Sequence, residues 1–385
     1  MKKVYCFGVG LHTYVKKLVE NPPKGYKFIV VQNEKKSNII SKLKKNKLIL
    51  YLYKEVYQKA FNSFNLINNI FYEKSPKDAD LIFSHGQLVQ EEKPWIVEIL
   101  DTPTSFAGYD LKLFRKNLRK INKILASRWC KKIIIHTSIV RREFENFFSK
   151  EILKKIELLP PAIPPSKIIE KRKNSKSIIF LFMGSINNPD DFYSKGGLEV
   201  LETFKKLSKR YDNIKLVMRA KVPQNIKERY LLNNIEYLEE TLPMARIQQL
   251  YRDADIFFFP GHFYFLMATL EAMSFGLPII ALDRHGVSEF IIDGKNGFLV
   301  KPSEKIPYPP VETPYLGVRS KKFINHLKVI DPIVVNRLYN RAARLIENKN
   351  LREKMGAESL KISNTKFSLE KRNKRLKEIF DAALK

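Results

Sequence analysis

The 385-residue sequence predicts an α/β fold made of two doubly wound parallel sheets in tandem. Three observations support this prediction. Short apolar runs of strand length alternate with helical patterns, as is typical of parallel sheets covered on both faces. The alternation stops at a stretch rich in proline and lysine, residues 158–177, and then begins again. The chain is also longer than one hydrophobic core usually grows.

The first half opens with a βαβ unit. Residues 2–32 read as a strand, a glycine turn, a helix that ends near Asn21, and a second strand. Further strands are expected in the segments DLIFSHG, PWIVEIL and KKIIIHTS, which are separated by helical patterns. We therefore expect an N-terminal doubly wound domain over residues 1–168.

The second half repeats this alternation. Its expected strands are SIIFLFMG, IKLVMRA, IEYLE, DIFFFP and PIIALD, and its expected helices are GGLEVLETFKKLSKRY, ARIQQLYRDA and YFLMATLEAMSFG. We expect a C-terminal doubly wound domain over residues 169–365. A last helix, SLEKRNKRLKEIFDAAL with Ser368 as its N-cap, places residues 366–385 in a terminal segment that packs back on the N-terminal domain.

Composition bears on partners and on location. The chain has 70 Lys and Arg against 40 Asp and Glu, a net charge of +30, which favours anionic partners. No signal peptide and no apolar run of membrane-spanning length is apparent, and the two cysteines, Cys6 and Cys130, have no metal-binding or disulfide spacing. These features predict a cytoplasmic protein.

Ligands of doubly wound sheets bind at the carboxyl ends of the strands, so we expect the site in a cleft between the two domains. Gly8 and Gly10 follow the first strand there and allow a phosphate to approach the backbone, although a plain tight turn explains them equally well.

Glu271 is a second candidate. The helix that carries it begins between Tyr264 and Met267, and its free N–H groups form an anion site. A carboxylate one to two turns into this helix can accept two hydrogen bonds from a vicinal diol such as a ribose. The alternative is a solvent-facing glutamate, which is common in helices.

The order LEAMSFGLPIIA followed by GVSEFIIDGKNGFLV resembles the donor-binding half of retaining glycosyltransferases of family four. These enzymes have the GT-B fold, in which two Rossmann-like domains face an interdomain cleft. The segments GVGLHTYVKKL, SKGGLEVLETFKKL and IQQLYRDADIFFFP also fit, so the resemblance covers nearly the whole chain. It is strongest over residues 176–301 and looser before residue 150.

The resemblance implies transfer of a sugar from a nucleoside-diphosphate sugar to a hydroxyl of a carbohydrate or lipid-linked acceptor, such as a cell-surface glycan precursor, with no further cofactor. Glu271 then corresponds to the second acid of the family's Glu-x7-Glu pair, which holds the donor ribose. Lys195 corresponds to the lysine that contacts the diphosphate, unless it is an exposed surface lysine, and Leu266 and Met267 lie at the donor-binding helix start.

Three positions depart from the family pattern. Phe263 stands where the first acid of the pair is expected, which leaves the donor sugar open. Ser185 stands where an arginine usually contacts phosphate, and Arg219 is the candidate replacement. The family's acceptor-side histidine aligns with Leu100.

The acceptor side therefore rests on other residues. Asp101 is the polar side chain nearest to the missing histidine, and His85 ends a neighbouring expected strand. We expect both to lie near the acceptor hydroxyl and take them as the candidate catalytic residues.

Two Asp-Ala-Asp triplets, residues 78–80 and 253–255, imitate a metal-binding motif. Both precede strands and so lie at the amino ends, away from the expected site. The histidines show no metal-binding spacing either. We expect no metal ligands and a metal-independent reaction.

Residues 111–132 carry basic side chains and no acid, and a helical wheel places Arg115, Lys116, Arg119 and Lys120 on one face. A core-packed helix with a solvated face explains this pattern. The alternative is electrostatic contact with anionic lipid, which would place the enzyme peripherally at the inner face of the cell membrane.

Two other functions fit parts of the sequence. A sugar-nucleotide epimerase or hydrolase on the same fold would need acid and base side chains in the cleft, and few are available. The positive charge suggests nucleic acid, but the sequence contains no recognised nucleic-acid module, which disfavours that partner.

Overall fold

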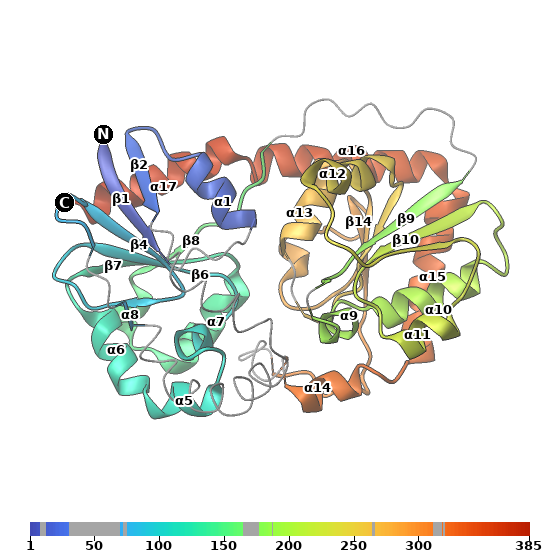
Figure 1. Ribbon diagram of the computed structural model, residues 1–385, viewed down its shortest axis with the longest axis horizontal. Coiled ribbons are helices and arrows are strands. Elements are labelled where there is room, and N and C mark those ends of the chain that lie inside the picture. Colours follow the sequence, from blue (N-terminus) through green and yellow to red (C-terminus); the bar gives the residue numbers. More distant parts are fainter. Residues whose placement is uncertain are drawn as a thin grey trace, which may run out of the picture. The chain divides into compact units, whose positions relative to one another are not determined.

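The structure is a computed structural model that describes residues 1–7, 13–30, 70–71, 75–164, 177–186, 188–263, 266–310, 318 and 320–385. The chain forms two compact units. The first contains Met1–Pro161 and Arg372–Lys385, and the second contains Ala162–Pro310 and residues 318–371. Each unit has a six-stranded parallel sheet with helices on both faces, which confirms the predicted doubly wound α/β architecture (Figure 1).

The first sheet has the strand order β2-β1-β4-β6-β7-β8. Its strands are β1 (Lys2–Phe7), β2 (Tyr26–Val30), β4 (Leu81–His85), β6 (Trp95–Ile99), β7 (Cys130–Ile135) and β8 (Ile156–Leu158). Every residue of β4 and β6 is buried, because helices cover both faces of these central strands. A separate two-stranded ladder joins β3 (Ile70–Phe71) to β5 (Leu88–Val89).

The terminal helix is part of the first unit's core. Phe380 of α17 (Leu369–Ala383) packs edge-on against the rings of Tyr26 and Phe28, which belong to β2, and of Phe83, which belongs to β4. The other helices of this unit are α1 (Thr13–Glu20), η2 (Pro103–Ala107), α5 (Leu111–Lys116), α6 (Leu118–Ala126), α7 (Ser138–Phe147) and α8 (Lys150–Leu153).

The prediction of one basic helix through residues 111–132 is wrong. The chain breaks between α5 and α6 at Asn117, whose backbone leaves the helical region at φ −106° and ψ 9°. The Asn117 side chain donates a hydrogen bond to the Leu113 carbonyl at 2.9 Å. The Asn117 N–H is shared between the Leu113 and Phe114 carbonyls, at 3.1 Å each, which tightens the last turn of α5. Residues 130–135 form strand β7 instead.

The second sheet has the order β11-β10-β9-β12-β13-β14. Its strands are β9 (Ile178–Met183), β10 (Ile214–Arg219), β11 (Ile235–Leu238), β12 (Ile256–Phe258), β13 (Ile279–Leu282) and β14 (Gly297–Val300). The strand order reverses between β9 and β12. Open α/β sheets bind ligands at such a reversal, beyond the carboxyl ends of the strands.

Nine helical segments surround the described part of this sheet. They are α9 (Asp190–Ser194), α10 (Gly197–Leu207), α11 (Gln224–Arg229), α12 (Met244–Asp253), α13 (Leu266–Ser274), η3 (Val287–Glu289), α14 (Lys321–His326), α15 (Pro332–Glu347) and α16 (Lys349–Lys366).

The two Asp-Ala-Asp triplets lie at the amino ends of strands, as predicted. Asp80 accepts a hydrogen bond from the backbone N–H of Lys3 at 2.7 Å, and Asp255 accepts one from Ile179 at 2.8 Å. These carboxylates therefore join neighbouring strands.

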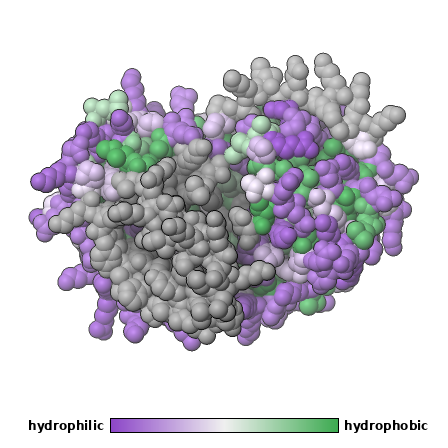
Figure 2. Space-filling view, in the orientation of Figure 1, coloured by the Kyte–Doolittle hydropathy of each residue, from purple (hydrophilic) through white to green (hydrophobic). Residues whose placement is uncertain are grey.

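The coloured part of the molecular surface in Figure 2 is mostly hydrophilic, with small apolar areas. Within the described residues, no helix is both long enough and apolar enough to cross a bilayer.

Candidate functional site

The reversal point of the second sheet is closely packed. Arg219 ends β10, and its guanidinium donates a hydrogen bond to the Gly184 carbonyl at 3.1 Å. Gly184 follows β9, and a Cβ there would lie 2.5 Å from the Ala220 Cβ, which is closer than packed atoms approach. Glycine at this position therefore allows β9 and β10 to end side by side and places Arg219 at the strand ends.

Lys195 lies in the turn between α9 and α10, directly against the loop that follows β12. The Ser194 carbonyl accepts hydrogen bonds from the backbone N–H groups of His262 and Phe263, at 2.9 and 3.3 Å. Gly196 has φ +78°, and a Cβ there would lie 2.2 Å from the Pro260 carbonyl oxygen. Only glycine fits this left-handed turn, so the Lys195 backbone is held in place.

The pKa of Lys195 is lowered to about 8, mainly by burial, which Asp191 opposes and the positive charge of Arg219 assists. Burial also lowers the pKa of Arg219. Two neighbouring cations that are partly removed from water favour an anion between or beside them.

Glu271 joins the same group of residues. It lies in α13, and its Oε2 accepts a hydrogen bond from the Tyr251 hydroxyl at 3.2 Å. Tyr251 is 1% exposed and stacks on Phe275 with the ring centroids 5.5 Å apart. Burial and the Glu271 charge raise the pKa of Tyr251 well above its usual value, and the Arg219 charge opposes them. Lys195 and Tyr251, the hydrogen-bond partner of Glu271, therefore both lie near Arg219.

Of the four other donor-site candidates, the structure describes two. Leu266 and Met267 form the first turn of α13, with Leu266 buried and Met267 half-buried. Gly8 and Gly10 lie outside the described residues.

A buried relay next to Lys195 was not predicted from the sequence. His262 is 1% exposed, and its Nε2 lies 2.7 Å from Oε1 of Glu199, while its Nδ1 lies 2.6 Å from the Tyr308 hydroxyl. These bonds connect the first turn of α10 with the loop after β12. The one sequence signal was a histidine placed just after the expected strand DIFFFP.

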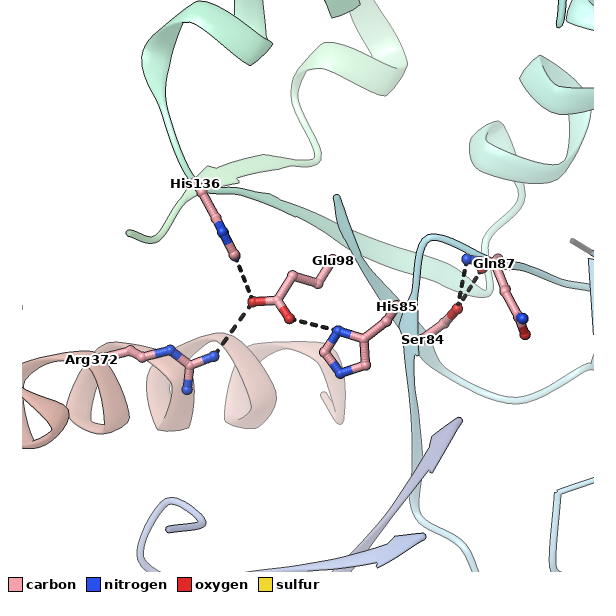
Figure 3. Close-up of polar contacts among 6 residues, drawn as sticks. All are labelled: Ser84, His85, Gln87, Glu98, His136 and Arg372. Atoms are coloured by element: carbon pink, nitrogen blue, oxygen red, sulfur yellow. Dashed lines mark hydrogen bonds and ion pairs between the residues drawn. The ribbon is translucent and has the colours of Figure 1, made fainter. Parts of the chain in front are cut away.

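The first unit contains a second buried polar cluster, shown in Figure 3. Glu98 of β6 is fully buried; its Oε2 lies 2.8 Å from Nδ1 of His85, and its Oε1 lies 2.9 Å from Nε2 of His136. Arg372 of α17 donates to the same Oε1 at 3.4 Å. Burial alone would raise the pKa of Glu98, but the hydrogen bonds and charges of His136 and His85 outweigh it and hold that pKa well below its usual range.

Both acceptor-side candidates lie at the carboxyl ends of central strands of the first sheet. His85 ends β4 and is held by Glu98. Asp101 follows β6 and is buried, and its Oδ1 accepts hydrogen bonds from the Thr102 N–H at 2.9 Å and the Tyr109 hydroxyl at 3.2 Å. Sequence reasoning missed Glu98, His136 and Arg372 as partners of His85.

The side chains predicted to meet a membrane or an acceptor surface are exposed. Within the part of the chain that the structure describes, none of them forms an ion pair. They are Arg115, Lys116, Arg119 and Lys120. Over the same described residues, no group of three or more His, Cys, Asp or Glu side chains is arranged to hold a metal ion.

Comparison with known proteins supports the expected resemblance. Residues 177–307 match the family model described as glycosyl transferases group 1. An uncharacterized glycosyltransferase of Haemophilus influenzae is 27% identical over 187 residues, which is 47% of this chain and 50% of that protein. The alpha-1,3/1,6-mannosyltransferase ALG2 of Dictyostelium discoideum is 24% identical over 180 residues, 43% of this chain and 42% of that protein. The chain thus aligns with about half the length of these relatives.

Solved structures are similar over nearly the whole chain. The Anabaena protein HepE, crystallised with UDP and glucose, has a TM-score of 0.60 at 13% identity, with 99% of each chain covered. Sucrose-phosphate synthase from Thermosynechococcus elongatus has a TM-score of 0.62 at 13% identity, covering 99% of this chain and 98% of that one. The predicted GT-B fold and the predicted resemblance to group 1 glycosyltransferases are therefore confirmed.

Proposed function

We propose that this protein is a retaining glycosyltransferase that binds a nucleoside-diphosphate sugar in its second unit and transfers the sugar to a hydroxyl acceptor. The observation that carries the proposal is the grouping of Lys195, Arg219 and Glu271 at the reversal point of the second sheet. A diphosphate and a ribose are the two chemical groups that such cations and such a carboxylate would bind.

In this proposal Lys195 and Arg219 bind the diphosphate. When the bond between the sugar carbon and the phosphate oxygen breaks, negative charge develops on the departing diphosphate. Preorganised cations in a site of low polarity stabilise that charge strongly. These two side chains supply the positive charge that a divalent metal provides in other enzymes, so we propose a metal-independent reaction.

Glu271 accepts hydrogen bonds from the ribose hydroxyls in this scheme. Its Oε2 already accepts from the buried Tyr251 hydroxyl, which restricts the orientation of the carboxylate. UDP is the first nucleotide to test, because the similar HepE structure is a UDP complex.

The acceptor is a carbohydrate or lipid-linked hydroxyl that meets His85 and Asp101 of the first unit. The exposed cations of α5 and α6 favour an anionic membrane surface, and Tyr109, immediately before them, is 43% exposed. We propose that the enzyme works in the cytoplasm at the inner face of the cell membrane.

The test is nucleotide binding measured by calorimetry with UDP, GDP, ADP and single-stranded RNA. We expect a nucleoside diphosphate to bind, and Lys195→Gln to weaken it about tenfold or more, because a charge-assisted hydrogen bond contributes roughly 1.5–3 kcal/mol. The exposed Lys209→Gln is the matched control. Binding of RNA alone would contradict the proposal.

The pH dependence provides a second check. The Lys195 ammonium attracts the diphosphate only while it is protonated, and its pKa in the free protein is about 8. Affinity for the nucleotide should therefore decrease as the pH rises through about 8.

A panel of nucleotide sugars separates transfer or slow hydrolysis from epimerisation, because an epimerase returns an intact nucleotide sugar.

A further inference from the structure

Arg284 is a half-buried cation that the donor scheme above does not use. It follows β13 at the carboxyl edge of the second sheet. Its guanidinium makes no hydrogen bond and no ion pair with the described part of the chain, and its Nε is fully buried without a partner. Burial lowers the pKa of Arg284, opposed by Tyr308 and Asp283. A guanidinium has five N–H donors, and leaving a buried one such as the Nε–H of Arg284 unsatisfied is unfavourable.

The position of this guanidinium is well defined. It lies over the ring of Tyr308, with its central carbon 4.1 Å from the ring centroid. The Tyr308 hydroxyl bonds His262, which bonds Glu199, so the aromatic platform is itself held by the buried relay. This contrasts with Arg219, whose guanidinium already donates to a backbone carbonyl.

The surroundings of Arg284 form a small recess with no acidic side chain among its described walls. A cavity of about 20 Å³ is lined by Arg284 together with Phe263 and Thr269. The next residue, His285, is buried, and its pKa is lowered to about 3 by burial and by the Arg284 charge, so its ring is neutral. His285 also has φ +51°, a strained backbone conformation that commonly marks functional loops.

The strand order places this recess on one side of the diphosphate site. Along the sheet edge, Arg219 ends β10, the Lys195 turn packs on the loop after β12, and Arg284 follows β13. Arg284 and Arg219 are three strands apart, roughly 14 Å at 4.8 Å per strand, which is longer than a diphosphate. Glu271 accepts a hydrogen bond from Tyr251, which lies near Arg219, so in the proposed scheme the ribose binds on the Arg219 side and the donor sugar extends toward Arg284.

We propose that Arg284 binds a carboxylate on the donor sugar, which makes the substrate a nucleoside-diphosphate uronic acid. This inference rests on the proposed function, because it assumes that the second unit binds the nucleotide. A guanidinium matches a carboxylate with two parallel N–H···O bonds, and the described lining of the recess, which includes the apolar Phe263, contains no acid.

The test compares matched donors that differ only at C6 of the sugar. Calorimetry would give the Kd of UDP, UDP-glucose and UDP-glucuronic acid, and of UDP-galactose and UDP-galacturonic acid. We expect at least one uronic acid to bind about tenfold or more tightly than its neutral counterpart. Equal affinities within both pairs would overturn the inference, and this comparison needs no variant.

The variant Arg284→Gln should abolish the preference for the uronic acid and change the Kd of UDP by less than about twofold. Arg284→Lys keeps the charge and should retain part of the preference. An equal loss for UDP and for the uronic acid would place Arg284 on the diphosphate and overturn the inference. If GDP or ADP binds in place of UDP, the matched donors carry that base. Failure of the wild-type protein to bind any of the three nucleoside diphosphates would instead count against the proposed function, and the Lys195→Gln experiment tests that function separately.

Discussion

Replacing Glu271 with glutamine tests the ribose assignment directly. The substitution keeps the size and helix propensity of the side chain but removes its charge. If Glu271 accepts both ribose hydroxyls, each charge-assisted bond contributes roughly 1.5–3 kcal/mol, and a loss of about 1.4 kcal/mol corresponds to a factor of ten in affinity. We therefore expect the Kd of the best-binding nucleoside diphosphate to increase about tenfold or more.

The structure refines this magnitude, because Oε2 of Glu271 also accepts the Tyr251 hydroxyl. Tyr251→Phe removes that neutral hydroxyl while the buried ring remains, so it should weaken nucleotide binding less than Glu271→Gln does. A hydrogen bond of this kind contributes about 0.5–1.5 kcal/mol, which corresponds to roughly two- to tenfold. The exposed Glu240→Gln is the isosteric control and should leave affinity unchanged.

A double-mutant cycle with the ligand separates the ribose from other contacts. The 2′,3′-dideoxy nucleoside diphosphate should bind poorly to the native protein and lose little more on Glu271→Gln, because both changes remove the same interaction. Calorimetry provides the four dissociation constants. Additive losses would show that Glu271 acts away from the ribose hydroxyls and would refute the assignment. An unchanged Kd on Glu271→Gln would identify a surface glutamate without a binding role.

Three further predictions concern other parts of the molecule. Sugar transfer should survive excess EDTA; complete loss that Mg²⁺ or Mn²⁺ restores would contradict the metal-independent scheme. Binding to anionic vesicles should weaken steeply with salt, and replacing four exposed cations with glutamine should weaken it further, whereas unchanged partitioning would mean that this face is only solvated. Those cations are Arg115, Lys116, Arg119 and Lys120. Arg372→Gln should lower the free energy of unfolding by about 3–5 kcal/mol, because it leaves Glu98 without its arginine, while Arg375→Gln on the same helix should lower it by less than about 1 kcal/mol. Equal losses in the two arginine variants, measured by urea titration, would contradict this prediction. The folded-state pKa of Glu98 lies below its usual value near 4.5. The stability that ionised Glu98 contributes is therefore present above that pH and is lost as the pH falls through the folded pKa.

The sequence by itself determined the architecture. Local hydrophobic periodicity marks buried strands and amphipathic helices, and their alternation requires parallel sheets. The left-handed turn at Gly196 was not predicted, because the sequence analysis placed this glycine at the start of the expected helix GGLEVLETFKKLSKRY. The resemblance pointed to Glu271 and Lys195, and the structure places Lys195 near Arg219 and joins Glu271 to Tyr251 by a hydrogen bond.

Periodicity did not show where a helical pattern is interrupted. The wheel of residues 111–132 assumed a continuous helix, but the backbone leaves the helical region at Asn117, whose N–H is shared between the Leu113 and Phe114 carbonyls, and α5 ends there. The backbone conformation of a single residue decides this break, and a hydrophobic pattern does not encode it.

Only the tertiary structure decided which polar groups meet. His85, His136 and Arg372 are distant from one another in sequence, and they converge on the buried Glu98 carboxylate because parallel strands end at the same edge and α17 returns to the first sheet. Likewise, the isolation of Arg284 follows from what the fold places around it. Burial strengthens the hydrogen bonds of Glu98 and makes the unsatisfied Nε of Arg284 unfavourable. Burial is a property of the packed chain and cannot be read from any short segment of it.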